Sequence, residues 1–220
     1  SSAASDVYKR QQQVRRQKIF LTCLFLLIVG CILLRFSKFS GRQEEAHQIN
    51  AACEAYRDEV SSEAAQYDMS DYVDLILAVM MQESSGQGTD PMQSSEGAYN
   101  TRYPQQPNGI TDPSYSISCG IQELKYALEK AVCTGPTDLA KIRLALQAYN
   151  FGADSYFAYL EENGQTVWTA QSAQAFAQMA SGGTQRDEDD PLHDPAGPWD
   201  YGDQYYPDHV LRYYHLDNNS

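Results

Sequence analysis

The feature that most constrains this chain is an apolar helical stretch that ends in a carboxylate and continues into a polar loop, at residues 70–96. Its side chains recur at i, i+3, i+4, i+7 and i+10, the spacing of one helix face: Val73, Ile76, Leu77, Met80 and Glu83. The carboxylate therefore continues the apolar stripe instead of lying opposite it. The stretch predicts a helix that begins near Ser70, with Asp71 and Asp74 in the first turn, where the dipole favours acids.

Glu83 is predicted to keep a proton near neutral pH. Burial on the stripe and the negative end of the helix dipole both disfavour its charged form, which raises its pKa. A carboxylic acid that is protonated near neutral pH can serve as the general acid in the cleavage of a glycosidic bond. The alternative is a solvated side chain at a frayed helix end, because Ser84, Ser85 and Gly86 follow directly.

Two more carboxylates, Asp90 and Glu96, lie in the loop that follows the helix. Hydrolysis by two carboxylates needs a second one across the cleft from the acid. Gly86 and Gly88 allow the chain to turn, so we expect Asp90 to fold back over the cleft as the base that assists water, with Glu96 as its rival. The alternative for each is an ordinary solvated loop charge.

Three short motifs resemble a known family of enzymes. They are the pair Glu83-Ser84, the segment Met92-Gln93-Ser94-Ser95-Glu96 and the segment Ala148-Tyr149-Asn150-Phe151-Gly152. In this order they are similar to the signature of soluble lytic transglycosylases and goose-type lysozymes. The sequence MMQESSGQGTDPMQSSE resembles even more closely the lysozyme-like domain of CwlT-type cell-wall hydrolases, which are carried by conjugative elements of Gram-positive bacteria. The similarity runs over residues 56–214.

The resemblance implies a cleft with Glu83 as the acid and with sugar-binding side chains around it. The residues it assigns to substrate binding are Gln93, Ser95, Glu96, Tyr149 and Asn150. The match departs from the usual pattern at Phe151, where most members have a small residue. Without the resemblance, Tyr149 would be an ordinary core aromatic, Asn150 a residue at a helix C-terminus, and Gln93 a helix N-terminal cap.

The N-terminal part predicts a membrane anchor. Residues 1–18 are polar and basic, and residues 19–34 form an uncharged apolar run slightly shorter than the roughly 20 residues that span a bilayer. The flanking charges place the N-terminus in the cytoplasm and the rest of the chain outside the cell, anchored by a single span at residues 19–36. A lipoprotein acylated at Cys31 is the alternative; a cleaved signal peptide is disfavoured, because no A-x-A site follows.

The charge of the chain changes sign after this segment. Of 29 acidic residues only Asp6 precedes residue 43, whereas half of the 16 basic residues do. The exported part therefore carries 28 acidic and eight basic residues, a poor surface for nucleic acid. The expected partners are peptidoglycan glycan strands, the cell membrane and other conjugation or secretion proteins.

The cysteines and histidines predict no metal site and no cofactor. Cys53, Cys119 and Cys133 lie outside the apolar run, and none has metal-ligand spacing with another or with the four histidines. We expect Cys119 and Cys133 on one helix, about 21 Å apart, so at most one disulfide can form and Cys53 would share it. The acidic run at residues 187–190 lacks the spacing of a calcium-binding EF-hand.

The exported part is predicted to be mainly helical. We expect helices over residues 44–66, 70–83, 113–133, 138–150, 153–163 and 170–181 and a last one within 201–214, with Asp112, Thr137 and Gly152 as caps and a loop at residues 99–111. The expected organisation is a cytoplasmic tail (1–18), an anchor (19–36), a stalk (37–55), a lysozyme-like domain (56–216) with a flexible insertion (182–200), and a short tail (217–220).

The expected function is cleavage of the β-1,4 bond between N-acetylmuramic acid and N-acetylglucosamine by an N-acetylmuramidase, opening the wall locally for conjugative transfer. Two alternatives stay open. A lytic transglycosylase would leave 1,6-anhydro ends, and a non-catalytic module would bind glycan or position other proteins of a secretion machine.

Overall fold

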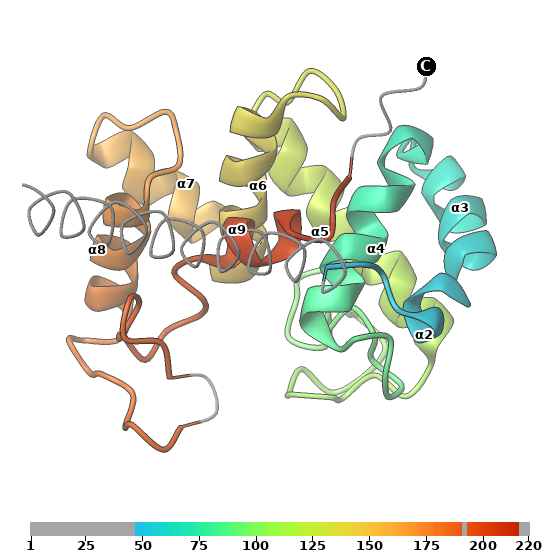
Figure 1. Cartoon of the computed structure of the whole chain (residues 1–220), viewed down its shortest axis with the longest axis horizontal. Coiled ribbons are helices and arrows are strands. Elements are labelled where there is room, and N and C mark those ends of the chain that lie inside the picture. Colours follow the sequence, from blue (N-terminus) through green and yellow to red (C-terminus); the bar gives the residue numbers. More distant parts are fainter. Residues whose placement is uncertain (1–46, 191–192, 216–220) are drawn as a thin grey trace, which may run out of the picture. The chain divides into compact units, whose positions relative to one another are not determined.

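The structure, a computed structural model, describes residues 47–190 and 193–215. This part of the chain is mainly helical, has no strands, and belongs to one compact unit that begins at Ile49 (Figure 1). No helix within it is long and apolar enough to cross a membrane. The predicted anchor at residues 19–36 lies outside the described residues.

Within the described residues, two helices rather than one precede the segment that carries Glu83. They are α2 (Ala51–Glu54), capped by the Asn50 side chain, which accepts a hydrogen bond from Cys53 N at 2.8 Å, and α3 (Arg57–Gln66). The single helix expected over residues 44–66 is therefore wrong. No Pro or Gly marks the break. Arg57 pairs across it with Glu54 and also reaches Asp74, both at 2.7 Å, so ion pairs stabilise the corner.

The helix that ends at Glu83 is the centre of the unit. A short 3₁₀ turn, η1 (Ser70–Tyr72), leads into α4 (Val73–Glu83). Six consecutive residues of α4, 75–80, are buried, so this helix is enclosed on all sides rather than along one stripe. It packs against α2, α3 and the C-terminal helix α9 (Tyr206–Leu211).

Two longer helices pack against each other, and the second of them also packs against α9. The first, α5 (Pro113–Lys130), begins with the predicted cap, because the Asp112 side chain accepts from Ser114 N. It ends before Cys133, so Cys119 and Cys133 do not share a helix. The next, α6 (Leu139–Phe151), is capped by Asp138 rather than by Thr137, and the chain leaves it at Gly152, whose φ of 84° suits glycine.

The remaining helices, α7 (Ala153–Glu162) and α8 (Ala170–Ala180), enclose an aromatic cluster. The rings of Phe151, Tyr156, Phe176 and Tyr201 lie with centroids 5.1–5.8 Å apart. Residues 182–200 are not helical where the structure describes them, and Gln185 and Trp199 form an isolated antiparallel bridge. The chain then returns as α9, which packs against both α6 and α4 (Figure 1).

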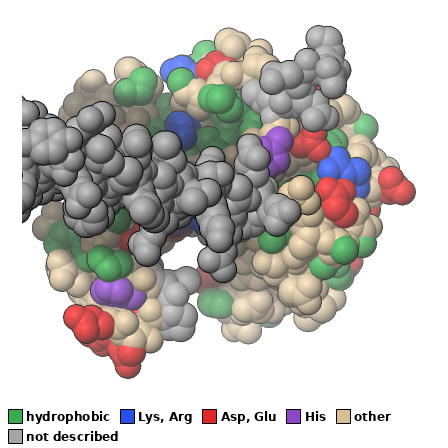
Figure 2. All heavy atoms as spheres, viewed as in Figure 1, with side chains coloured by type: hydrophobic (Ala, Val, Ile, Leu, Met, Phe, Trp, Pro, Cys, Tyr) green, Lys and Arg blue, Asp and Glu red, His purple; other side chains and the backbone are tan. Residues whose placement is uncertain are grey.

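Two further features of this unit bear on the sequence predictions. Cys53, Cys119 and Cys133 are free thiols, so no disulfide joins them. On the face in Figure 2, acidic side chains stand at several places on the surface and basic ones are few, as the charge of the sequence predicts.

Candidate active site

Two adjoining hollows meet at Glu83. Their volumes are about 650 and 610 Å³, and both are bordered by Glu83, Asn150 and Gly202. The larger one also borders the loop that follows α4, helix α5 and the start of α7, and the smaller one borders the segment before α9. Together they form a cleft that crosses the end of α4, with Glu83 in its middle.

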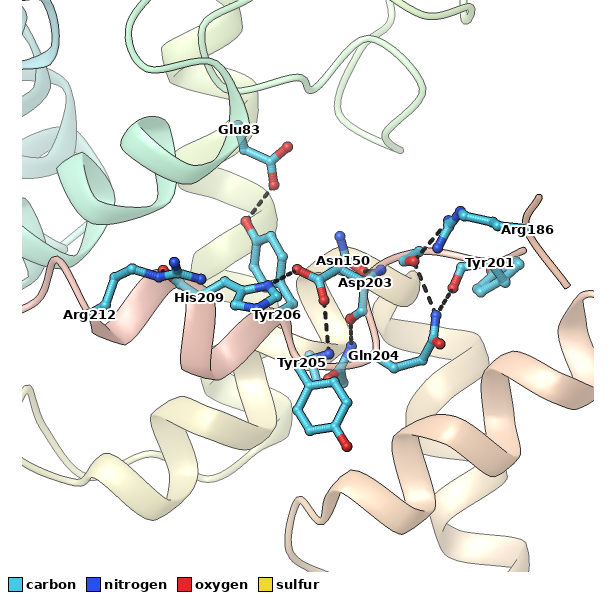
Figure 3. A network of polar contacts seen from close by, with 12 residues as sticks. Glu83, Asn150, Arg186, Tyr201, Asp203, Gln204, Tyr205, Tyr206, His209 and Arg212 are labelled. Atoms are coloured by element: carbon cyan, nitrogen blue, oxygen red, sulfur yellow. Dashed lines mark hydrogen bonds and ion pairs between the residues drawn. The ribbon is translucent and has the colours of Figure 1, made fainter. Parts of the chain in front are cut away.

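Glu83 is held by a tyrosine from the other end of the chain. It is the last residue of α4 and is partly buried, and the hydroxyl of Tyr206 donates a hydrogen bond to its Oε1 (Figure 3). Tyr206 is itself only 2% exposed, and its ring stacks on that of Tyr149 with centroids 6.3 Å apart. One carboxyl oxygen, Oε1, is therefore held by a hydrogen bond, and the other, Oε2, is left for a ligand in the cleft.

The surroundings of Glu83 favour its protonated form. Burial is the main cause that raises its pKa, to about 7, and the negative charges of Asp203 and Asp90 act in the same direction. The hydrogen bond from Tyr206 acts in the opposite direction and is weaker. The result agrees in direction with the sequence expectation, so a substantial fraction of Glu83 carries a proton near neutral pH.

Tyr149 and Asn150 reach the cleft from the last turn of α6, as the resemblance implies. The Tyr149 hydroxyl donates to Met92 O at 3.0 Å, and Asn150 Oδ1 accepts from Asp203 N at 2.7 Å (Figure 3). These bonds tie α6 to the loop after α4 and to the segment before α9. Each residue therefore both borders the cleft and positions one of its walls.

Gln93 and Glu96 also border the larger hollow, and both are exposed. Gln93 has a φ of 50° and is not a helix cap. Its amide nitrogen donates to Asp90 O at 2.9 Å and to Asn108 Oδ1 at 3.1 Å, so it spans the loop on this side. Glu96 and Gln93 are therefore within reach of a bound ligand.

Asp90 and Ser95 do not reach the cleft, which corrects the sequence expectation. Both are 1% exposed and border neither hollow. The Asp90 carboxylate accepts from Ser94 N at 3.0 Å, from Ser95 N at 3.2 Å, from the Ser95 hydroxyl and from Ser116 Oγ at 2.6 Å. The loop turns inward because these donors surround the carboxylate, so Asp90 organises the loop from beneath it.

The sequence reasoning missed three features of the site. The first is Tyr206. The second is the pair formed by Asp203 and His209, in which Nδ1 of the imidazole contacts the Asp203 carboxylate (Figure 3). The third is Glu123 on α5, which borders the larger hollow. The sequence did contain a signal for Glu123, because this residue lies on a buried stripe of α5, as Glu83 does on α4. The stripe on α5 consists of Ser116, Gly120, Glu123 and Ala127.

The side chains that converge here can supply proton transfer and hydrogen bonding. Among the described residues, no three His, Cys, Asp or Glu side chains are arranged to hold a metal ion. The cleft instead combines several carboxyl groups, Glu83 and Glu123 among them, with tyrosine hydroxyls and amides. Such a set is suited to bind polyhydroxy compounds and to donate a proton.

Several known proteins are similar to this chain in sequence. A family model described as lysozyme-like matches residues 51–214. The bifunctional muramidase/DL-endopeptidase CwlT of Bacillus subtilis (strain 168) is 35% identical over 173 residues, which cover 79% of this chain and 43% of that protein. A pneumococcal vaccine antigen A homolog of Streptococcus pyogenes serotype M1 is 37% identical over 110 residues, half of each chain.

A solved structure shows the same fold. The crystal structure of a protein described as similar to a lipoprotein of the NLP/P60 family, from Staphylococcus aureus Mu50, matches with a TM-score of 0.64 and 28% sequence identity. The match covers 79% of this chain and 56% of that one. The aligned part of the chain spans about half the length of these relatives or less.

Proposed function

The chain belongs to the lysozyme-like family, and on this premise we propose that it is a peptidoglycan hydrolase, an N-acetylmuramidase with Glu83 as its general acid. The bond it cuts is the β-1,4 linkage between N-acetylmuramic acid and N-acetylglucosamine. The observation that carries the proposal is the place of Glu83, a carboxyl group with a raised pKa in the middle of an open cleft. The muramidase activity in the name of CwlT supports the choice of substrate.

The proposed reaction begins with a proton on Oε2 of Glu83. Because the Tyr206 hydroxyl donates to Oε1, that oxygen is the acceptor, and the proton of the neutral acid resides on Oε2. A glycan strand bound along both hollows, beside Gln93, Tyr149 and Asn150, would present its glycosidic oxygen to this proton. Protonation lets the leaving sugar depart from an oxocarbenium-like transition state.

The cellular setting is also a proposal and rests on the sequence. The apolar run at residues 19–36 would anchor the chain in the cell membrane and leave the cleft on the outer side, facing the wall. The resemblance to proteins of conjugative elements suggests that the enzyme opens the wall locally for a transfer machine.

The test is clearing of purified Gram-positive cell walls by the full chain and by two variants. Wild type should lower the turbidity, and Glu83→Gln should lose about 10²–10⁴-fold in rate, because an amide cannot donate the proton. Glu129→Gln is the matched control, since this exposed glutamate on α5 lies away from the cleft. No turbidity loss from wild type would favour a non-catalytic module, and full activity of Glu83→Gln would remove the acid assignment.

A further inference from the structure

We propose that Glu123 is the second carboxyl group of the reaction and acts as the general base that activates the attacking water. This inference rests on the proposed function and adds the residue that makes the enzyme a hydrolase rather than a transglycosylase. It assigns to Glu123 the role that the sequence suggested for Asp90, whose carboxylate is enclosed by serine donors beneath the loop.

The first support is position. Glu123 extends from α5 into the hollow that Glu83 also borders, together with Tyr126 and Tyr149. Its carboxyl group lies directly against the backbone of Gly97, where a Cβ atom would overlap Glu123 Oε1. Glycine at position 97 therefore leaves room for this carboxyl group at the wall of the cleft.

The second support is an unused hydrogen-bonding capacity. Glu123 Oε1 is buried and has no hydrogen-bond partner. Buried polar atoms without a partner are rare and costly in folded proteins, and they commonly mark places where a bound group completes the bonding. A water or sugar hydroxyl bound in the cleft would provide the missing donor after a small rotation of the carboxyl group.

The third support is electrostatic and agrees with the geometry. Burial raises the pKa of Glu123 to about 7; a hydrogen bond from the Tyr99 backbone lowers it, and the charges of Asp90 and Glu83 raise it. Burial is the main cause that raises the pKa of Tyr149, and the charges of Glu123 and Glu83, which border the same hollow, raise it further. A carboxyl group whose pKa lies near 7 is well matched to accept a proton from water at neutral pH.

The proposed reaction consumes one glycan strand and one water molecule. Glu83 gives its proton to the glycosidic oxygen while the bond from that oxygen to the anomeric carbon breaks. The water oxygen forms the new bond to the anomeric carbon, and Glu123 takes one water proton. Exchange with solvent then returns a proton to Glu83 and removes one from Glu123, and the products are two shorter strands, one with a reducing muramic end.

The experiment compares the full-length wild type with Glu123→Gln on purified walls, with Glu129→Gln as the control on the same helix. Mass spectrometry should find reducing muramic ends for wild type, heavier by one water than anhydro ends. Glu123→Gln should lose about 10²–10⁴-fold in rate and keep its circular dichroism spectrum. Added azide, an anion that attacks without a base, should restore bond cleavage to Glu123→Gln as a glycosyl azide but not to Glu83→Gln.

Two more variants keep the test decisive if the amide variant does not fold. Glu123→Asp retains a carboxyl group one methylene further back, and Gly97→Ala displaces the carboxyl group without altering it. Both should lower the rate and leave reducing ends, and Glu123→Asp should lose less than Glu123→Gln.

Each contrary result has a distinct meaning. Anhydro ends from wild type, an unchanged rate in Glu123→Gln, or a loss of rate that azide does not relieve would each overturn the role of Glu123. Glycan cleavage that depends on Glu83 would still stand in all three cases, but anhydro ends would make the enzyme a lytic transglycosylase rather than a hydrolase. A wild type that cleaves no glycan would overturn the proposed function itself, and this inference with it.

Discussion

The hydroxyl of Tyr206 donates a hydrogen bond to Oε1 of Glu83, joining two residues 123 positions apart in the chain. The bond connects the end of α4 with the start of α9, the two helices that border the cleft at this point. It fixes one oxygen of the carboxyl group and limits how far burial raises its pKa.

Tyr206→Phe should raise the pKa of Glu83 further, because it removes the one contact that lowers it. The alkaline limb of the activity profile should therefore move to higher pH, while the maximal rate falls because the acid is no longer held. Rates of wall cleavage measured from pH 5 to pH 9 test both effects. An unshifted limb would mean that the hydroxyl does not act on Glu83.

Wild-type activity should fall as the pH rises through about 7. Glu83 must carry a proton to act as the acid, and burial places its pKa there. Glu123, as the proposed base, should produce a fall on the acidic side, so the profile should be a narrow bell with apparent pKa values that belong to the pair. A rate that stays level up to pH 9 would contradict the buried-acid argument.

The free energy of unfolding should fall between about pH 4.5 and pH 7, and Glu83 should contribute to the fall. The ordinary pKa of 4.5 applies in the unfolded chain and a value of about 7 in the folded one, so protonation favours the folded state. This contribution is fully present below pH 4.5 and is lost as the pH rises through 7. It amounts to at most roughly 3 kcal/mol.

Glu83→Gln is the variant that tests this linkage. The free energy of unfolding of Glu83→Gln should exceed that of wild type by more at pH 8 than at pH 5, because the amide has no charge to bury. Urea unfolding at both pH values measures the difference. Glu129→Gln, at an exposed position on α5, is the matched control.

Asp90→Asn should lower stability by about 2–4 kcal/mol, because an amide presents two N–H groups where the carboxylate accepts from four donors. Activity should fall in parallel, because the loop that carries Gln93 and Glu96 would lose its ordered conformation. Asp68→Asn is the control, since the Asp68 side chain is 97% exposed. A large loss of rate without any loss of stability would instead return Asp90 to a direct chemical role.

Gln147→Leu should destabilise the protein by about 2–4 kcal/mol. Gln147 is fully buried; its amide nitrogen donates to Asp203 O at 2.8 Å and its oxygen accepts from Trp168 Nε1 at 2.9 Å. Leucine would remove both bonds and leave the half-buried Trp168 Nε1 without a partner, whereas Asp203 O would keep the bond from Tyr206 N at 3.2 Å. Thermal melts measure the effect, and Gln178→Leu, at an exposed position on α8, should change stability little.

Most of the helices and the place of Glu83 could be predicted from local sequence patterns. Periodicity and local caps act over a few residues, so α4, the Asp112 cap of α5 and the Gly152 end of α6 could be predicted from the chain. The motif at the end of α6 likewise placed Tyr149 and Asn150 beside the cleft. The break between α2 and α3 could not be predicted, because Arg57 stabilises it through an ion pair to Asp74 on a different helix.

Contacts between distant segments determine which carboxyl groups face the cleft. Asp90 lies in the loop after α4 and is the second carboxylate that the sequence predicts, with Glu96 as its rival, whereas Glu123 lies on α5. The direction of each side chain depends on donors from distant segments: Ser116 on α5 draws Asp90 inward, and the absence of a side chain at Gly97 leaves the wall open for Glu123. Tyr206 reaches Glu83 only because α9 packs against α4, and no local pattern in the sequence encodes that contact.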